Sequence, residues 1–306
     1  MISIVICHRN VSFLQKIKQN IKNTIGTPYE LHVIDNSKNE YSIFEAYNLG
    51  VSKSQYPIIC FTHEDILFHT SSWGTHVVEH FKDERIGMIG ICGGDSIPIV
   101  PAPWWNSKTL NHHYFNNINT WEGKKSYHQY SNPFQEKISD VALLDGAWFC
   151  ISKKLFEQII FDTKTFTGFH CYDSDICLQI INIKKKVCVI YDVLLEHFSP
   201  GTINQDWIDS ADKLVDKWNL QLPYFVNNVD KKMISKYNYE CLLTYCYWFQ
   251  SLNYPEKEIR RKIKKYLDRI KPIEYFYPSF ILLWLWYMVG YKIARYLYFP
   301  INLIKR

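Results

Sequence analysis

Short apolar runs alternate along the first part of the chain with segments in which apolar residues recur at helical spacing. The runs that predict strands lie at 2–7, 30–35, 57–62 and 86–91. The segments between them predict helices, of which the second opens with a capping box formed by Ser42 and Glu45, and the third covers 71–82. Strands that alternate with helices indicate βαβ units, so we expect an α/β fold with a mainly parallel central sheet flanked by helices.

The stretch 98–133 breaks this alternation. It is rich in proline, tryptophan, histidine and tyrosine, and a long irregular insert in a compact domain is often functional. The alternation then resumes, with strands expected at 141–151 and 187–190 and helices at 153–160 and 175–184. A further amphipathic helix is indicated by apolar residues at helical spacing, namely Trp207, Ala211, Leu214 and Trp218.

The character of the chain changes after Pro223, where helical, tyrosine-rich segments begin, so we expect two domains, 1–222 and 223–306. The segment 280–291 holds twelve residues without a charge, fewer than the roughly 20 that a membrane span needs. Two interpretations stay open. The segment is a membrane-interfacial anchor, as its Trp and Tyr residues and the neighbouring basic run 257–265 favour, or it is a hydrophobic helix packed on the protein body or on a dimer partner.

The composition shows that charge is distributed unevenly along the chain, and it indicates the cellular compartment of the protein. The 306 residues are 47% hydrophobic, enough for a full α/β core and a smaller appendage. The net charge is +5, but residues 251–306 hold twelve basic against four acidic residues, which indicates an anionic surface as partner. Nine scattered cysteines without a CxxC pair suggest a reducing compartment, and no secretory signal opens the chain. We therefore expect a cytoplasmic protein, peripheral on the inner face of the membrane.

Acids and an imidazole stand where predicted strands end and a helix begins. Asp65 ends the third apolar run, His197 follows a later one, and Asp173 lies at a predicted helix start. Open α/β sheets bind ligands at such positions. Two of these groups can share a divalent cation and the third can take a proton, which suits transfer of a group from a nucleotide diphosphate.

Seven segments in order resemble the family 2-like glycosyltransferases of the GT-A fold, and together they cover about residues 1–220. The segments lie at 2–10, 33–37, 46–50, 61–65, 144–147, 172–178 and 197–199. The resemblance implies a nucleotide-sugar donor, with a UDP-sugar as the first choice, a divalent metal (Mn²⁺ or Mg²⁺) and an acceptor hydroxyl. The chain departs from the family's pattern at several positions. His63 occupies the first acidic place of an Asp-x-Asp motif, Tyr172 stands where an acid often precedes the base, and Cys7 or His8 replaces a proline.

Asp65 is the first metal ligand that we expect, with help from His63 or Glu64 and with His197 from the far side of the site. Mn²⁺ and Mg²⁺ prefer oxygen ligands, and Mn²⁺ also tolerates imidazole. Side chains alternate along an extended segment, so His63 and Asp65 should share a face and Glu64 should point elsewhere. The alternative is that residues 63–65 form a cap or a solvated turn and that His197 has a structural role.

The resemblance makes Asp173 the general base, which takes the proton of the acceptor hydroxyl in one direct, inverting displacement. Asp175 either caps the helix or binds an acceptor hydroxyl, and both acids have the alternative role of helix N-caps. Asp145 and Gly146 are expected at the donor sugar or the acceptor, because glycine permits a close backbone approach; a plain turn is the alternative.

The nucleotide is expected at the ends of the first two strands. Asp35 can accept from uracil N3–H or a ribose hydroxyl, or it can cap a turn. The other expected nucleotide contacts are His8, Arg9, Asn10 and Asn48. Trp104, Trp105 and Trp121 form either a stacking wall for an acceptor sugar or the packing of the insert onto the sheet.

The sequence thus predicts an inverting, metal-dependent glycosyltransferase at the cytoplasmic membrane face. It would transfer a sugar to a glycan or lipid-linked acceptor, in the synthesis of a surface polysaccharide. The alternative is a non-catalytic nucleotide-sugar-binding or scaffold protein that retains the fold. Nucleic acid is not an expected partner, because the basic end interleaves bulky aliphatic and aromatic residues and shows no RNA-binding signature.

Overall fold

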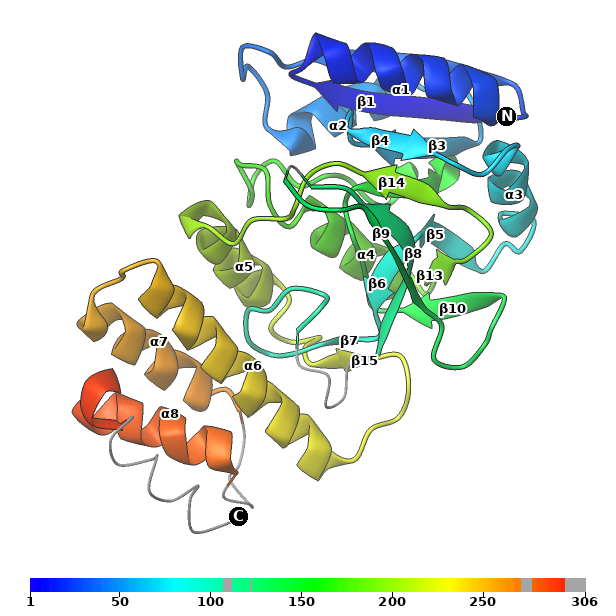
Figure 1. Ribbon diagram of the computed structural model, residues 1–306. Coiled ribbons are helices and arrows are strands. Elements are labelled where there is room, and N and C mark those ends of the chain that lie inside the picture. Colours follow the sequence, from blue (N-terminus) through cyan, green and yellow to red (C-terminus); the bar gives the residue numbers. More distant parts are fainter. Residues whose placement is uncertain (107–111, 122, 271–276, 295–306) are drawn as a thin grey trace. The chain divides into compact units, whose positions relative to one another are not determined.

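The computed structural model describes residues 1–106, 112–121, 123–270 and 277–294. The chain forms two compact units (Figure 1), and each unit combines two separate stretches of sequence. Unit 1 comprises 1–95 and 112–202, and unit 2 comprises 96–111 and 203–306. This division differs from the predicted one, because the first part of the insert and the helix at 205–217 belong to the helical unit.

Unit 1 is built on a seven-stranded sheet of order β10-β13-β5-β12-β3-β1-β2. Its strands are β1 (Ile2–His8), β2 (Tyr29–Asp35), β3 (Ile58–Thr62), β5 (Ile86–Gly90), β10 (Ile138–Val141), β12 (Trp148–Ser152) and β13 (Lys186–Ile190). The prediction of a mainly parallel sheet is wrong. The sheet is mixed, because β12 runs antiparallel to both β3 and β5, and β10 runs antiparallel to β13.

The single strand expected at 141–151 is divided into three. The chain leaves β10, pairs briefly with another sheet as β11 (Leu143–Leu144), and then turns into β12. The turn is closed by the Asp145 side chain, whose Oδ1 accepts a hydrogen bond of 2.9 Å from the backbone N–H of Ala147. The strands β10 and β12 run in the same direction, because β10 is antiparallel to β13, β13 is parallel to β5, and β12 is antiparallel to β5.

A second, smaller sheet was not expected from the sequence. Its order is β11-β6-β8-β14-β4, with β9 paired to β8. The strands are β4 (Ile66–Phe68), β6 (Cys92–Gly94), β8 (His113–Asn119), β9 (Tyr127–Ser131) and β14 (Leu195–His197). Part of the insert therefore forms the β8–β9 hairpin, and the antiparallel pairing of β14 with β4 sets His197 opposite Ile66.

Four helices accompany the sheets of unit 1, as Figure 1 shows: α1 (Val11–Thr24), α2 (Ile43–Lys53), α3 (Trp73–His80) and α4 (Tyr172–Asn182). The predicted capping box is confirmed, since Ser42 and Glu45 exchange side-chain and backbone hydrogen bonds at the start of α2. The helix expected at 153–160 is a short 3-10 segment, η1 (Lys153–Glu157). Fully buried aromatic rings fill the core of the unit, among them Tyr47, Phe61, Trp148 and Phe149.

The described part of unit 2 includes the helices α5 (Gln205–Lys217), α6 (Lys231–Ser251), α7 (Glu256–Leu267) and α8 (Pro278–Val289), and the short strand pair β7 (Ser96–Ile97) and β15 (Tyr224–Phe225). One face of α8 is buried through Phe280, Leu282, Leu283 and Trp286. The indole of Trp286 donates a 2.9 Å hydrogen bond to Glu256 at the start of α7. In the described part of the chain, every helix is too short or too polar to cross a bilayer.

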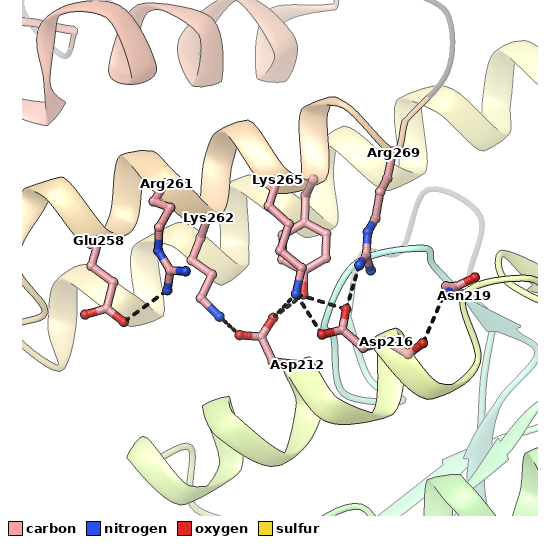
Figure 2. A network of polar contacts seen from close by, with 9 residues as sticks. Asp212, Asp216, Asn219, Glu258, Arg261, Lys262, Lys265 and Arg269 are labelled. Atoms are coloured by element: carbon pink, nitrogen blue, oxygen red, sulfur yellow. Dashed lines mark hydrogen bonds and ion pairs between the residues drawn. The ribbon is translucent and has the colours of Figure 1, made fainter.

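Much of the basic run is paired inside unit 2, as Figure 2 shows. Asp212 of α5 contacts Lys262 and the hydroxyl of Tyr266 on α7. Asp216, one turn further along α5, pairs with Lys265 at 2.9 Å and with Arg269 at 2.6 Å. The run therefore ties α7 to α5, which weakens its expected role as a free basic surface.

Candidate active site

The two sheets of unit 1 bring three ligand-bearing side chains together. His63 and Asp65 lie in the link from β3 to β4, and His197 ends β14 opposite Ile66. The backbone N–H of Phe198 donates to the carbonyl of Asp65 at 3.1 Å, which closes the gap between the segments. The Oδ1 atom of Asp65 lies 3.6 Å from Nε2 of His197 and 4.0 Å from Nδ1 of His63.

This cluster has the chemistry of a divalent-cation site. Its two imidazole nitrogens and one carboxylate oxygen all lie within 4.8 Å of one another. A carboxylate suits Mn²⁺ and Mg²⁺, and imidazole nitrogens add a preference for transition ions such as Mn²⁺. The side chains are largely buried, with 14% of Asp65 and 16% of His197 exposed.

Glu64 points away from this cluster. Its carboxylate accepts hydrogen bonds from the backbone N–H groups of Arg9 and Asn10, at 3.1 Å and 2.9 Å. The alternation of side chains along an extended segment explains why the residues on either side of Glu64 face the cluster. Of the four predicted metal ligands, the structure thus brings three together and leaves Glu64 at the start of α1.

The three side chains of the cluster shift one another's pKa values. Burial alone would raise the pKa of Asp65, but the hydrogen bond and charge of His197, together with His63, outweigh it and hold that pKa well below its usual range. Burial would lower the pKa of His197, yet Asp65 raises it overall. Burial and the neighbouring His197 lower the pKa of His63, so His63 is neutral at physiological pH.

Tyr172 is a site residue that sequence reasoning missed. Its side chain is buried, and its hydroxyl donates a 2.9 Å hydrogen bond to the carbonyl of Gly146 and lies 2.8 Å from Nε2 of His63. The close approach that was expected at Gly146 is made by this hydroxyl, since a Cβ at position 146 would lie 2.2 Å from it. The signal in the sequence was the tyrosine at a position that is often acidic in the family.

Asp173 follows Tyr172 in the first turn of α4. Burial and the nearby Asp145 carboxylate raise the pKa of Asp173 to about 7, although hydrogen bonds from Ser174 oppose the shift. A carboxyl group with this pKa can exchange a proton near neutral pH, as a general base requires. The N-cap of α4 is Cys171, so Asp173 and Asp175 are not N-cap residues, although both lie in the first turn of the helix.

The remaining predicted substrate residues lie in different surroundings. Asp175 is buried and accepts a 2.7 Å hydrogen bond from Gln179. Asp145 closes the turn before β12 and also acts on the pKa of Asp173. Trp104 and Trp105 belong to unit 2, where Trp105 packs against Trp248 of α6 at a centroid distance of 6.0 Å.

Trp121, the third tryptophan of the insert, belongs to unit 1 and lies in the link between β8 and β9. Its ring packs edge-on against Tyr127 at a centroid distance of 5.8 Å, and the ammonium group of Lys124 lies 4.9 Å from it. These local contacts place Trp121 within the hairpin connection.

The predicted nucleotide residues gather at the carboxyl ends of β1 and β2. His8 and Asp35 are paired in the strand register, and Nε2 of His8 lies 3.7 Å from Oδ1 of Asp35. His8 is buried, whereas Asp35 is exposed and accepts from the backbone N–H of Ser37. Arg9 is exposed, and Asn10 is the N-cap of α1.

Asn48 has a structural role in this arrangement. Its side-chain amide donates to the carbonyl of Phe161 at 2.8 Å, and its side-chain oxygen accepts from the N–H of Phe161 at 3.2 Å. Both polar ends of the side chain are therefore engaged with one backbone segment.

Residues 3–225 match the model of a family described as glycosyltransferase-like, so the chain belongs to that family. None of the curated proteins matches the chain. The family region covers all of the clustered residues described above and extends into unit 2.

Two solved structures share the fold. The crystal structure of GalNAc-T7 with UDP, GalNAc and Mn²⁺ is similar with a TM-score of 0.51 and 12% identity, over 96% of this chain and 57% of that chain. S. aureus TarS 1-349 is similar with a TM-score of 0.57 and 11% identity, over 98% of this chain and 91% of that chain. At these identities the likeness shows a GT-A-like α/β fold. The chain spans little more than half the length of the GalNAc-T7 chain.

Proposed function

We propose that the protein is an inverting, divalent-metal-dependent glycosyltransferase that moves a sugar from a nucleotide diphosphate sugar to a hydroxyl group. A UDP-sugar is the donor that we favour, and a glycan or lipid-linked sugar of a surface polysaccharide is the acceptor. The observation that carries the proposal is the convergence of His63, Asp65 and His197 beside the helix that starts with Tyr172 and Asp173. The presence of UDP and Mn²⁺ in the GalNAc-T7 structure supports the choice of donor and metal.

His63, Asp65 and His197 would hold Mn²⁺ or Mg²⁺. When bound, such an ion neutralises charge on a departing diphosphate. His8, Arg9, Asn10 and Asp35 would contact the nucleotide at the ends of β1 and β2. Because Asn48 is engaged with the backbone of Phe161, its proposed role is to shape this region rather than to contact the nucleotide.

Asp173 would accept the proton of the acceptor hydroxyl while that oxygen attacks the anomeric carbon. A direct displacement of this kind inverts the anomeric configuration. The pKa of Asp173, about 7, leaves a substantial deprotonated fraction at neutral pH, yet it keeps the carboxylate basic enough to take a proton. Asp145, which helps to raise this pKa, would tune the base in addition to lining the site.

The experiment is a donor panel of UDP-, GDP- and dTDP-sugars incubated with the purified full chain, with and without Mn²⁺. Metal-dependent release of the nucleoside diphosphate from one donor is the expected result. Asp173→Asn should slow transfer strongly but still bind UDP. Asp192→Asn is the control, because it removes a different carboxylate of unit 1, one that pairs with His76 and His80 of α3 and has no role in the proposal. Tight UDP binding without turnover of any donor would instead favour a non-catalytic nucleotide-sugar-binding protein.

We also propose that α8 lies on a membrane surface. Ile281, Trp284, Leu285 and Met288 recur at the spacing of one helix face, and Trp284 and Met288 are exposed. A helix that is apolar on both its buried and its exposed face needs a second apolar partner. Since Lys262 and Lys265 of the basic run are paired with Asp212 and Asp216, apolar contact rather than charge would dominate this binding.

A further inference from the structure

The hydroxyl of Tyr172 lies between two groups of the candidate active site. One is the backbone carbonyl of Gly146 at 2.9 Å, and the other is Nε2 of His63 at 2.8 Å. The Tyr172 side chain is buried and cannot turn freely, because its ring packs edge-on against Tyr47 at 5.4 Å and against Phe44 at 6.3 Å. The hydroxyl is therefore held in this position.

The roles of donor and acceptor in this pair of contacts follow from the groups involved. A carbonyl oxygen can only accept, so the single hydroxyl hydrogen of Tyr172 goes to Gly146. The Tyr172 oxygen is then left as an acceptor toward His63, and Nε2 of His63 must carry the hydrogen. In a neutral imidazole the other nitrogen, Nδ1, then presents its lone pair.

We propose that Tyr172 is a positioning residue that fixes His63 in the Nε2-protonated tautomer and so directs the Nδ1 lone pair to the cation shared with Asp65 and His197. The cation in this statement rests on the proposed function, whereas the tautomer is a property of the metal-free protein. The Nδ1 atom is the one on the correct side, at 4.0 Å from Oδ1 of Asp65. Hydrogen bonds to the second nitrogen of a histidine ligand commonly set its tautomer and its ring orientation.

This arrangement connects three features of the sequence that looked independent. His63 and Tyr172 are both departures from the family's acidic pattern, and they are the two partners of one hydrogen bond. Gly146 completes the set, because any side chain at this position would displace the Tyr172 hydroxyl. A carboxylate at position 172 could not donate to the Gly146 carbonyl, so the tyrosine provides a hydrogen that an acid would lack.

The same helix start thus carries two functions. Tyr172 orients a ligand of the cation, and the next residue, Asp173, is the proposed base. Loss of the Tyr172 hydroxyl should therefore weaken metal binding first, and it should leave the fold intact because the ring packing is retained in phenylalanine.

The first test reads the tautomer directly. Long-range ¹⁵N–¹H NMR spectra of the metal-free full chain at pH 8 should show His63 protonated at Nε2, with its signals assigned by their absence in His63→Gln. In Tyr172→Phe the same signals should shift toward a mixture of the two tautomers. A wild-type His63 protonated at Nδ1 would overturn the proposal, and this reading needs neither turnover nor bound metal.

The second test measures Mn²⁺ binding with MnCl₂ alone by electron paramagnetic resonance. Tyr172→Phe should weaken binding by about 10- to 100-fold, the usual effect of removing a partner of a metal ligand. The matched control is Tyr114→Phe, which removes another buried hydroxyl of unit 1, one that donates to Asp95 at 3.2 Å. Equal affinities of Tyr172→Phe and the wild type would contradict the positioning role. If the wild type binds no Mn²⁺, the proposed metal site fails, while the NMR experiment still decides the tautomer.

Discussion

The Oδ1 atom of Asp65 and the Nε2 atom of His197 lie 3.6 Å apart, although the two residues are far apart in the sequence. The antiparallel pairing of β14 with β4 produces this contact. The carboxylate raises the pKa of the imidazole, and the imidazole keeps the carboxylate ionised. Below the raised pKa of His197 the metal-free pair is thus an ion pair with one proton, and a cation that binds to both must displace that proton.

Mn²⁺ binding should therefore depend on pH. Below the raised pKa of His197, each bound ion releases about one proton, so the affinity should rise with pH and level off above that pKa. Titrations of the full chain with MnCl₂ between pH 5.5 and 8.5, at constant ionic strength, would measure the slope. An Mn²⁺ affinity that does not change over this pH range would show that metal binding does not displace the proton of His197.

The pH dependence of turnover should report Asp173. Its raised pKa predicts an acidic limb near pH 7, below which the base is protonated and transfer slows. Asp145→Asn removes a neighbouring negative charge, so the pKa of Asp173 should fall and the limb should move to lower pH. Asp173→Asn should lower kcat by about 10²- to 10⁴-fold at pH 8. If the acidic limb of the Asp145→Asn variant stays at the same pH, the Asp145 carboxylate does not raise the pKa of Asp173.

The link between α5 and α7 should stabilise unit 2. Asp212→Asn leaves the partly buried Lys262 without its carboxylate, which should lower the free energy of unfolding by about 3 kcal/mol. Asp268→Asn is the control, because Asp268 pairs with Lys264 at the exposed surface and its loss should change the stability little. Denaturant unfolding of both variants would measure the difference. If both variants lose a similar free energy of unfolding, the contacts of Asp212 stabilise unit 2 no more than an exposed ion pair does.

The exposed face of α8 should bind lipid vesicles. Trp284→Ser with Met288→Ser should reduce flotation with vesicles, whereas Leu220→Ser, which changes an exposed leucine of unit 2, should not. Because much of the basic run is paired internally, added salt should weaken the binding only slightly. Unchanged flotation of the double variant would favour packing against another protein surface instead.

The sequence predicted the elements that carry strong local signals. The first strands, the capping box of Ser42 and Glu45, and the shared face of His63 and Asp65 follow from short-range periodicity and spacing. The GT-A-like fold could be predicted because the ordered segments lie at strand ends. Strand direction was harder to predict, because the antiparallel pairings of β10 and β12 are made with strands that lie far away in the sequence.

Long-range pairing accounts for what the sequence did not reveal. The strands β4 and β14 have three residues each, too few for a recognisable period, yet their pairing positions His197. Tyr172 resembles an ordinary core residue until its hydroxyl is seen between Gly146 and His63. Lys262 looked like part of a free basic surface because its partner Asp212 lies on another helix.

The most direct test of the central claim is calorimetric titration of UDP into the full chain with and without saturating Mn²⁺. The metal should strengthen UDP binding in the wild type and in the control Asp192→Asn, since the cation would bridge the protein and the diphosphate. Asp65→Asn should bind UDP with the same weak affinity whether or not Mn²⁺ is present. If Asp65→Asn retains the full effect of Mn²⁺ on UDP affinity, the cation does not bind where His63, Asp65 and His197 meet.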